Sequence, residues 1–338
     1  MSTETRASTA KSPAVESSRR GRWSGQRVVD LAIRNSMVIV LLLVMVYFTV
    51  ENSQFATFAN ARTILIAAAP FALVALGQTI VILTGGIDLS VGSVIALSAM
   101  TAAYIAVRNP DQVWLAILAA VAVGFTAGLI NGLIVSLLNV APFVATLGML
   151  TVASGLAYVI GDGAPIDGLP NSFGAIANTT VLGLQLPVFV MIAGFVILAT
   201  VMKYTSFGLR VYAVGGNRTA ADVAGVNTRR TLTSAYVISG TLAGMSGVIL
   251  SSRVISGPPN LGQGYELYAI AAVVIGGASL RGGRGTVWGT LLGLLLIQTL
   301  NNGLDILIVP AYWQSVISGI LIVAAVAVDM WATRRSSR

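Results

Sequence analysis

The run TILIAAAPFALVALGQTIVILT (residues 63–84) contains no charged side chain. A helix needs about 20 consecutive apolar residues to cross the hydrocarbon core of a bilayer, so this run predicts a membrane-spanning helix. The 338 residues are 56% hydrophobic and 9% charged, whereas about a quarter of the residues in a soluble domain are charged. Because the chain cannot cover a water-facing surface, we expect an all-α polytopic membrane protein.

Ten such apolar runs follow one another along the chain. They span residues 36–50, 63–84, 91–107, 113–138, 142–161, 184–202, 231–250, 267–280, 286–304 and 310–328. The basic flank of the first run also suits a signal peptide, but the polar stretch before it is too long for one. The eighth run is short and ends in glycines, which leaves nine spans as the alternative to ten.

The distribution of Lys and Arg predicts the orientation of these spans. Counting from an inside amino terminus, the inner segments hold seven before residue 36, five in 203–230, two in 281–284 and three after residue 331. The outer segments hold only Arg62, Arg108 and Arg253. Basic residues concentrate on the cytoplasmic side of membrane proteins, so both termini are expected inside.

The same pattern divides the chain into regions. Residues 1–35 are polar and basic and are expected to form a disordered cytoplasmic tail. Residues 36–330 form the transmembrane domain, with a cytoplasmic loop at 203–230, and residues 331–338 form a second cytoplasmic tail. The net charge of +8 therefore reflects topology, and no nucleic-acid partner is expected.

Two residue types are missing from the sequence. The chain has no Cys and no His, which removes disulfides, thiolate nucleophiles, Cys/His metal sites and imidazole proton relays. No catalytic cluster and no metal site is expected. The ten runs also lack charged residues in their interiors, since Asp88, Asp305 and Asp329 fall at or beyond their ends. Ion-coupled carriers usually need an intramembrane carboxylate, so that class is disfavoured.

Glycines at four-residue spacing mark two related stretches. Gly124, Gly128 and Gly132 lie in the fourth run, and residues 285, 289 and 293 repeat the spacing at the ninth. Small residues on one helix face allow close packing in lipid. Matching these stretches predicts an inverted repeat of spans 2–5 and 7–10. A competing match pairs the glycines at 85 and 86 with those at 276 and 277, and would require a different alignment.

The string GGIDLSVGS (residues 85–93) lies between the second and third runs. Paired glycines permit a sharp turn, Asp88 can accept from backbone amides, and Ser90 can begin the next helix. A tight, capped inner loop and a direct role in conduction are both compatible with this composition. The residues that define the string are Gly85, Gly86, Asp88, Leu89, Ser90, Gly92 and Ser93.

The inner loop 203–230 predicts a short surface helix. Thr219 is a suitable N-cap, Asp222 stands at the matching capping-box position, and Gly225 can end the helix. The small side chains of this helix would fit a groove in a partner protein. Contact with anionic lipid would explain Arg229 and Arg230, but it would not explain the helix signals.

Both strings resemble those of the sugar-type permease subunits of bacterial ABC importers, the family of ribose, xylose, arabinose and galactose transporters. GGIDLSVGS is similar to the signature of that family, and GLRVYAVGGNRTAADVAGVN (residues 208–227) is similar to its coupling-helix region. The later string VVIGGASLRGGRGTVWGTLLG (residues 273–293) is also similar. The resemblance covers roughly residues 56–328.

The resemblance implies a multi-pass subunit of the bacterial plasma membrane that imports a small neutral polyhydroxylated solute. Its implied partners are a cytoplasmic ATPase, a second permease copy or close homologue, and an extracytoplasmic solute-binding protein. ATP and Mg would be bound by the ATPase, because this chain contains no G-x-x-x-x-G-K-[ST] and holds no cofactor of its own. Nucleosides and branched-chain amino acids are the alternative solutes.

The resemblance also assigns roles to particular residues. The coupling helix that contacts the ATPase carries over onto Asn217, Arg218, Thr219, Ala220, Ala221, Asp222, Val223, Ala224 and Gly225. Replacing Ala221 with a bulky acidic residue is expected to abolish uptake and leave insertion intact. The uncharged polar residues proposed for the solute path are Gln78, Asn131, Asn301 and Asn302, although hydrogen bonding between helices would explain them equally well. Outer segments 162–183 and 251–266 are expected to dock the binding protein.

Overall fold

The structure, a computed structural model, describes residues 36–317, 319–320 and 323. The two predicted tails, 1–35 and 331–338, lie outside the described residues, as does part of the tenth apolar run. The main helices are α2 (Ser36–Glu51), α3 (Phe58–Leu83), α4 (Val91–Arg108), α5 (Val113–Leu137), α6 (Pro142–Ile160), α8 (Leu186–Tyr204), α11 (Thr228–Val254), α12 (Tyr265–Ile275) and α13 (Val287–Ile306). Each follows one of the first nine predicted runs closely.

Six of the described helices are long and apolar enough to cross a membrane, namely α3, α4, α5, α6, α8 and α11. Two apolar helices are shorter, the one at residues 37–51 and α12. The prediction of an all-α polytopic membrane protein is confirmed. Its finer parts, the count of ten spans and the inverted repeat, remain predictions.

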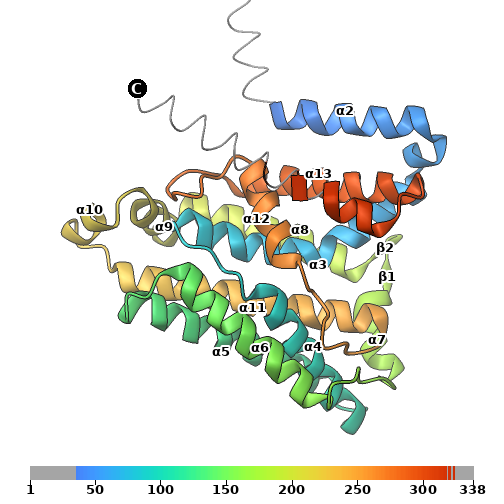
Figure 1. The fold of residues 1–338 in the computed structure, drawn as a ribbon, viewed down its shortest axis with the longest axis horizontal. Coiled ribbons are helices and arrows are strands. Elements are labelled where there is room, and N and C mark those ends of the chain that lie inside the picture. The colour runs from blue at the N-terminus through green and yellow to red at the C-terminus, as the bar shows by residue number, and fades with distance from the viewer. Residues whose placement is uncertain (1–35, 318, 321–322, 324–338) are drawn as a thin grey trace, which may run out of the picture.

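The connections contain elements that the apolar runs did not predict. These are η1 (Ser53–Ala56), α7 (Asn171–Asn178), α9 (Ser206–Gly216), α10 (Arg218–Val223) and an antiparallel hairpin of β1 (Thr180–Val181) and β2 (Leu184–Gln185). The short helices α9 and α10 lie at one end of the molecule, and α7 and the hairpin lie at the other (Figure 1). The long helices run between these two ends.

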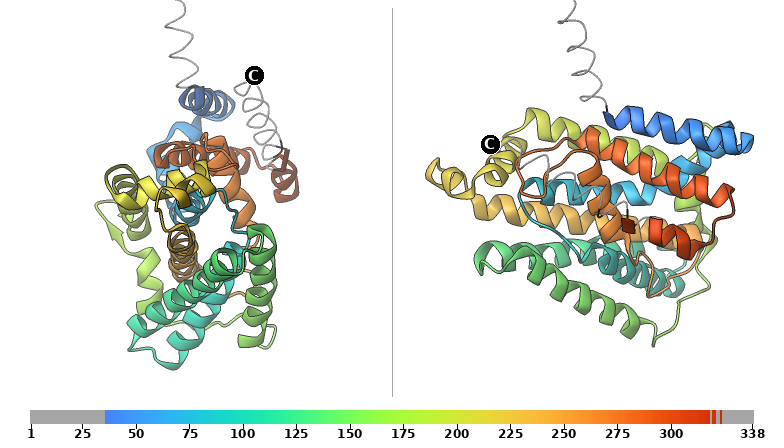
Figure 2. Two further views of the ribbon diagram at one scale, coloured as in Figure 1. Left: turned by 90° about the vertical axis from the view of Figure 1, so that its left-hand side faces the viewer. Right: turned by 45° about the horizontal axis from the view of Figure 1, so that its top comes forward.

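The long helices are stacked in layers around α11. In Figure 1 the order runs from α2 at one edge through α13, then α3 and α8, then α11, to α5 and α6 at the other edge. The end-on view in Figure 2 also places α2 and the α4–α5–α6 group at opposite edges. Helix α11 packs against α5, α4 and α3, so it is the central element of the bundle.

Glycines bring α5 and α11 into close contact. Gly124 and Gly128 face Gly240 and Gly244, and a Cβ added at Gly240 would lie 2.8 Å from both Cα and N of Gly128. Real Cβ atoms do not approach backbone that closely, so the two backbones touch directly. The predicted close packing of the fourth span is confirmed, and the partner is α11.

Helices α3 and α12 end in the same way. Gly85 and Gly277 have φ of +82° and +88°, and each N–H donates to the carbonyl three residues earlier, at 2.8 and 2.9 Å. The next residues, Gly86 and Ala278, donate to the carbonyl five residues earlier, at 3.0 and 3.1 Å. These bonds define a helix end that requires a left-handed residue, usually glycine. The structural correspondence thus pairs Gly85 with Gly277, one residue away from the match read from the sequence.

Candidate functional site

Helix α10 occupies the predicted coupling region. Asn217, in extended conformation (φ −160°), accepts from the N–H of Ala220 at 3.0 Å and caps the helix. The prediction of Thr219 as the N-cap is therefore wrong, because Thr219 already lies inside the helix. The predicted end is confirmed, since Gly225 has φ +83° and follows the last turn.

A side-chain hydrogen bond joins α10 to the central helix. Thr228, the first residue of α11, donates to Asp222 Oδ1 at 2.7 Å. Asn227 caps α11 by accepting from the N–H of Arg230 at 2.9 Å. Asp222 thus holds the start of α11 instead of completing the predicted capping box. This bond links α10 directly to the start of α11.

The two faces of α10 differ in burial. Ala221 is 5% exposed and packs with Val214 and Leu232 in a small core beneath the helix. Val223 is 86% exposed, and Ala220 and Ala224 are exposed as well. Val223 with the small residues Ala220 and Ala224 beside it forms a low apolar tip that is available to a partner protein.

Polar side chains surround the base of α10. Arg218 Nη2 donates to Asn139 Oδ1, which follows α5, at 3.4 Å. A cleft of about 580 Å³ lies here, and its lining is polar throughout: Asn139, Arg218, Thr219, Asp222, Asn227, Thr228 and Arg229. The exposed apolar tip of α10 therefore stands beside a polar, basic cleft.

The second predicted site, residues 85–93, is not an exposed loop. Its Asp88 is 1% exposed and accepts three hydrogen bonds from neutral donors. Oδ1 accepts from N and Oγ of Ser90 at 3.0 and 2.6 Å, and Oδ2 accepts from Ser239 Oγ of α11 at 2.9 Å. The expected capping by Asp88 is confirmed, but the contact with α11 was not predicted.

Three further helices hold the same segment. Asn131 Nδ2 of α5 donates to Ser90 Oγ at 2.9 Å, and Thr146 Oγ1 of α6 donates to the carbonyl of Ile87 at 3.3 Å. Gln78 of α3, in the amide orientation that satisfies its neighbours, donates to the Asp88 carbonyl at 3.2 Å and accepts from its N–H at 3.3 Å. The structure therefore brings Gln78 and Asn131, predicted for the solute path, together with Asp88 and Ser90.

The position of Ser239 sets the depth of this network. It is the twelfth residue of α11, about 16 Å along the helix from its start at 1.5 Å per residue. Asp88 follows the end of α3 in sequence, as expected, but its carboxylate lies inside the bundle. A carboxylate is therefore buried among the long helices, whereas the apolar runs led us to expect none there.

The other two polar residues predicted for the path lie elsewhere. Asn302 and Asn60 of α3 exchange two side-chain hydrogen bonds, at 2.8 and 2.9 Å. Asn301 is half-buried beside it. Gln78, Asn131 and Asn302 thus all hold bonds between segments of the chain, which was the alternative explanation for them.

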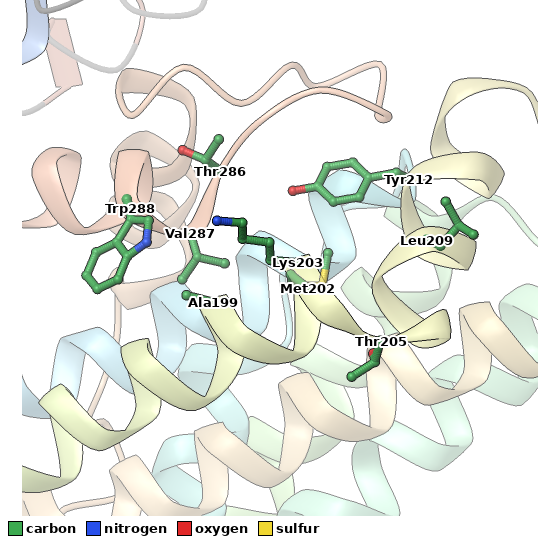
Figure 3. A pocket seen from close by; sticks show the side chains of 9 residues that line it. All are labelled: Ala199, Met202, Lys203, Thr205, Leu209, Tyr212, Thr286, Val287 and Trp288. Atoms are coloured by element: carbon green, nitrogen blue, oxygen red, sulfur yellow. The ribbon is translucent and has the colours of Figure 1, made fainter.

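A cavity of about 420 Å³ lies where α8 and α9 meet the start of α13. Figure 3 shows Lys203 extending across it between Trp288 and Tyr212. The Tyr212 hydroxyl donates to the carbonyl of Gly285 at 3.0 Å, and burial raises the pKa of Tyr212 above its ordinary value. This bond ties α9, which precedes the coupling helix, to the segment before α13.

Comparison with known proteins shows which family this chain resembles. The profile of a family described as "Branched-chain amino acid transport system / permease component" matches residues 60–326. The ribose import permease of Bacillus subtilis (strain 168) is 44% identical over 291 residues, which are 86% of this chain and 90% of that protein. No solved structure matches at a significant level.

Two further relatives are named for the transport of other sugars. The D-allose transport system permease of Escherichia coli (strain K12) is 35% identical over 86% of this chain and 89% of its own length. The L-arabinose transport system permease of the same strain is 33% identical over 87% of this chain and 90% of its own length. The similarity thus extends over nearly all of the described helices.

Proposed function

This chain belongs to the permease family of ATP-binding-cassette importers, and we propose that it is the membrane subunit through which a small neutral sugar or polyol enters the cytoplasm. Relatives named for ribose, allose and arabinose support a monosaccharide as the solute. The chain supplies the path, and a separate cytoplasmic ATPase, which binds ATP and Mg, supplies the energy.

The observation that carries the proposal is the exposed Val223 of α10, which stands beside a cleft lined by Arg218 and Arg229. The coupling residues, Asn217 to Gly225, dock into the ATPase. Closure of the ATPase then moves α10, the Asp222–Thr228 bond moves the start of α11, and α11 moves against the network around Asp88. Such a switch between two packed arrangements is a common way to transmit a local change over distance.

The topology is part of the proposal. The nine main helices, the tenth apolar run and the basic inner segments support ten spans with both termini in the cytoplasm. The repeat of spans 2–5 and 7–10 is proposed from the glycine spacing of the fourth and ninth runs, whereas the similar ends of α3 and α12, each at a left-handed glycine, favour the competing match of the second run with the eighth. The pathway lies between the two halves.

The solute passes weakly bound, because a path that holds its solute tightly cannot release it. Gln78, Asn131, Asn301 and Asn302 remain proposed for this path. Three of them are engaged in internal hydrogen bonds, so they reach the solute only in a state in which those bonds exchange.

The two remaining partners bind beside the subunit and at the end opposite α10. A second permease copy or close homologue completes the channel. The extracytoplasmic binding protein docks on the outer segments, which are tied together by two hydrogen bonds between Ile166 and Gly257, at 3.1 and 2.9 Å. That bridge supports a single, ordered docking surface at the end opposite α10.

The test is ATP hydrolysis by the complete complex in proteoliposomes. We expect hydrolysis to rise when the binding protein is loaded with one of D-ribose, D-allose or L-arabinose. Because the family description names branched-chain amino acids, L-leucine and L-valine are included as probes. Stimulation by an amino acid and by none of the sugars would reject the sugar assignment and keep the ABC importer.

A further inference from the structure

A small recess lies on the side of the helix bundle, separate from the Asp88 network. It has a volume of about 180 Å³ and is bounded by the first turn of α4, the second half of α6 and the segment 259–266. Its polar side chains are Ser93, Ser154, Tyr158, Asn260, Gln263 and Glu266. Neither the proposed coupling region nor the proposed path residues contribute to it.

The chemistry of this lining is that of a hydroxyl-binding site. It offers three hydroxyl groups, two amides and one carboxylate, and no lysine or arginine is among its lining residues. Gly92 is required for this arrangement, because a Cβ at that position would lie 2.7 Å from the backbone carbonyl oxygen of Gly262 and would also meet the Glu266 carboxylate. Residues 85–93 thus contribute to two separate features of the structure. Asp88 points into the bundle, and Gly92 and Ser93 line the recess.

The depth of the recess restricts what it can face. Ser154 is six residues before the end of α6 at Ile160, about 9 Å along the helix. On the same helix Val152 and Leu156 are 55% and 47% exposed, as expected for a helix in lipid. A carboxylate and two amides facing hydrocarbon would be strongly unfavourable, so the recess must face water or another protein.

We propose that this recess is a contact site for the solute on the outer part of the pathway, with Glu266 and Ser93 as its central hydrogen-bonding residues. The inference rests on the proposed sugar import and names residues that contact the sugar. The volume is below the roughly 300–1,000 Å³ of sites for drug-sized ligands, which suits one monosaccharide.

The lining also selects against the alternative solutes. Adjacent hydroxyls of a sugar can donate to the two oxygens of the Glu266 side chain. A branched-chain amino acid would bring a carboxylate, for which the lining holds no cation. The recess therefore favours polyhydroxylated neutral solutes.

The absence of cysteine from the chain provides the test. Ser154→Cys and, as a matched control two residues away, Val152→Cys are introduced into the complete complex in proteoliposomes. Each is treated with a charged, water-soluble methanethiosulfonate, which reacts with the thiolate and hence with thiols that contact water. We expect Ser154→Cys to react about tenfold faster than Val152→Cys, and its modification to stop ATP-driven sugar uptake.

Protection identifies the occupant. D-Ribose, D-allose and L-arabinose are tested at equal, high concentration, and at least one is expected to slow the labelling of Ser154→Cys severalfold, while L-leucine is not. Glu266→Gln in the same background should remove this protection and leave assembly with the ATPase unchanged. If Ser154→Cys itself impairs assembly, Ser93→Cys repeats the measurement from α4.

Three results would refute the recess as a sugar contact site without refuting sugar import. They are uptake that continues after full modification, labelling that no transported sugar slows, and a disulfide formed by Ser154→Cys between two permease copies. The disulfide would show that the recess lies at the interface between two permease subunits. Loss of sugar-stimulated hydrolysis and of uptake in the unmodified complex would instead reject the proposed function itself.

Discussion

Val223 offers the sharpest perturbation of the proposed coupling helix, because it is 86% exposed and its replacement leaves the packing of the chain intact. Val223→Ala removes two methyl groups from the surface that is expected to enter the ATPase. Val223→Glu places a carboxylate there. Both changes act on the complex and not on the fold of the isolated subunit.

The expected magnitudes follow from burial. At about 0.8 kcal/mol for each buried methyl or methylene group, Val223→Ala loses about 1.6 kcal/mol of binding free energy if the ATPase covers the side chain completely. That corresponds to roughly a fifteenfold rise in Kd. An unpaired carboxylate in an apolar groove costs several kcal/mol, so Val223→Glu is expected to raise Kd more than about a hundredfold.

The assay is titration of the purified subunit in nanodiscs with the ATPase. Leu182→Glu is the matched control, since Leu182 is 92% exposed and sits in the hairpin at the opposite end of the molecule (Figure 1). The control should bind the ATPase with unchanged Kd. Wild-type affinity in Val223→Glu would refute the assignment of α10 as the docking helix.

Three further predictions concern the bundle. Gly240→Leu should destabilise the purified subunit by the 1–3 kcal/mol or more that is typical of overpacking. Gly148→Leu should leave the stability unchanged, because a Cβ at Gly148 meets nothing within 4 Å. Equal melting temperatures of the two variants would contradict the close α5–α11 contact. Ser239→Ala removes a hydrogen bond to the buried Asp88 and should cost about 1.5–3 kcal/mol in denaturant unfolding, so an unchanged midpoint would show that this bond does not hold the segment. Burial raises the pKa of Tyr212 above 10.0, so the folded state keeps the proton that the unfolded chain loses; stability should fall as pH rises above about 10, and Tyr212→Phe should make this decline shallower.

The helices were predictable because their signal is local. Each of the first nine apolar runs corresponds to a helix whose bounds differ from the run by a few residues. The glycine spacing of the fourth run also predicted close packing correctly. In a bilayer every backbone polar group must be satisfied within the helix, so composition alone determines secondary structure over these stretches.

The buried network could not be read from the sequence, because it depends on contacts between distant segments. Asp88 and Ser239 are 151 positions apart, and nothing in the apolar run around Ser239 distinguishes that serine from its neighbours. Glu266 was placed in an outer segment by its position before an apolar run, whereas the structure puts it at the recess with Ser93. Such pairings require the packing of α4, α6 and α12.

The face of α10 that meets a partner was likewise hidden. The small residues of the coupling loop predicted a docking helix, and Ala221 was the chosen position for a disruptive substitution. Ala221 is 5% exposed and packs against Val214 and Leu232, so a bulky acid there would disturb the fold together with the contact. The exposed Val223 separates the two effects.

The central claim, that this subunit is a conduit driven by a separate ATPase, is tested most directly by sugar flux into proteoliposomes. The account predicts uptake of at least one of D-ribose, D-allose and L-arabinose only when the ATPase, ATP and the loaded binding protein are all present, and none when the subunit is reconstituted alone under a proton or sodium gradient. Sugar accumulation by the subunit alone would contradict it.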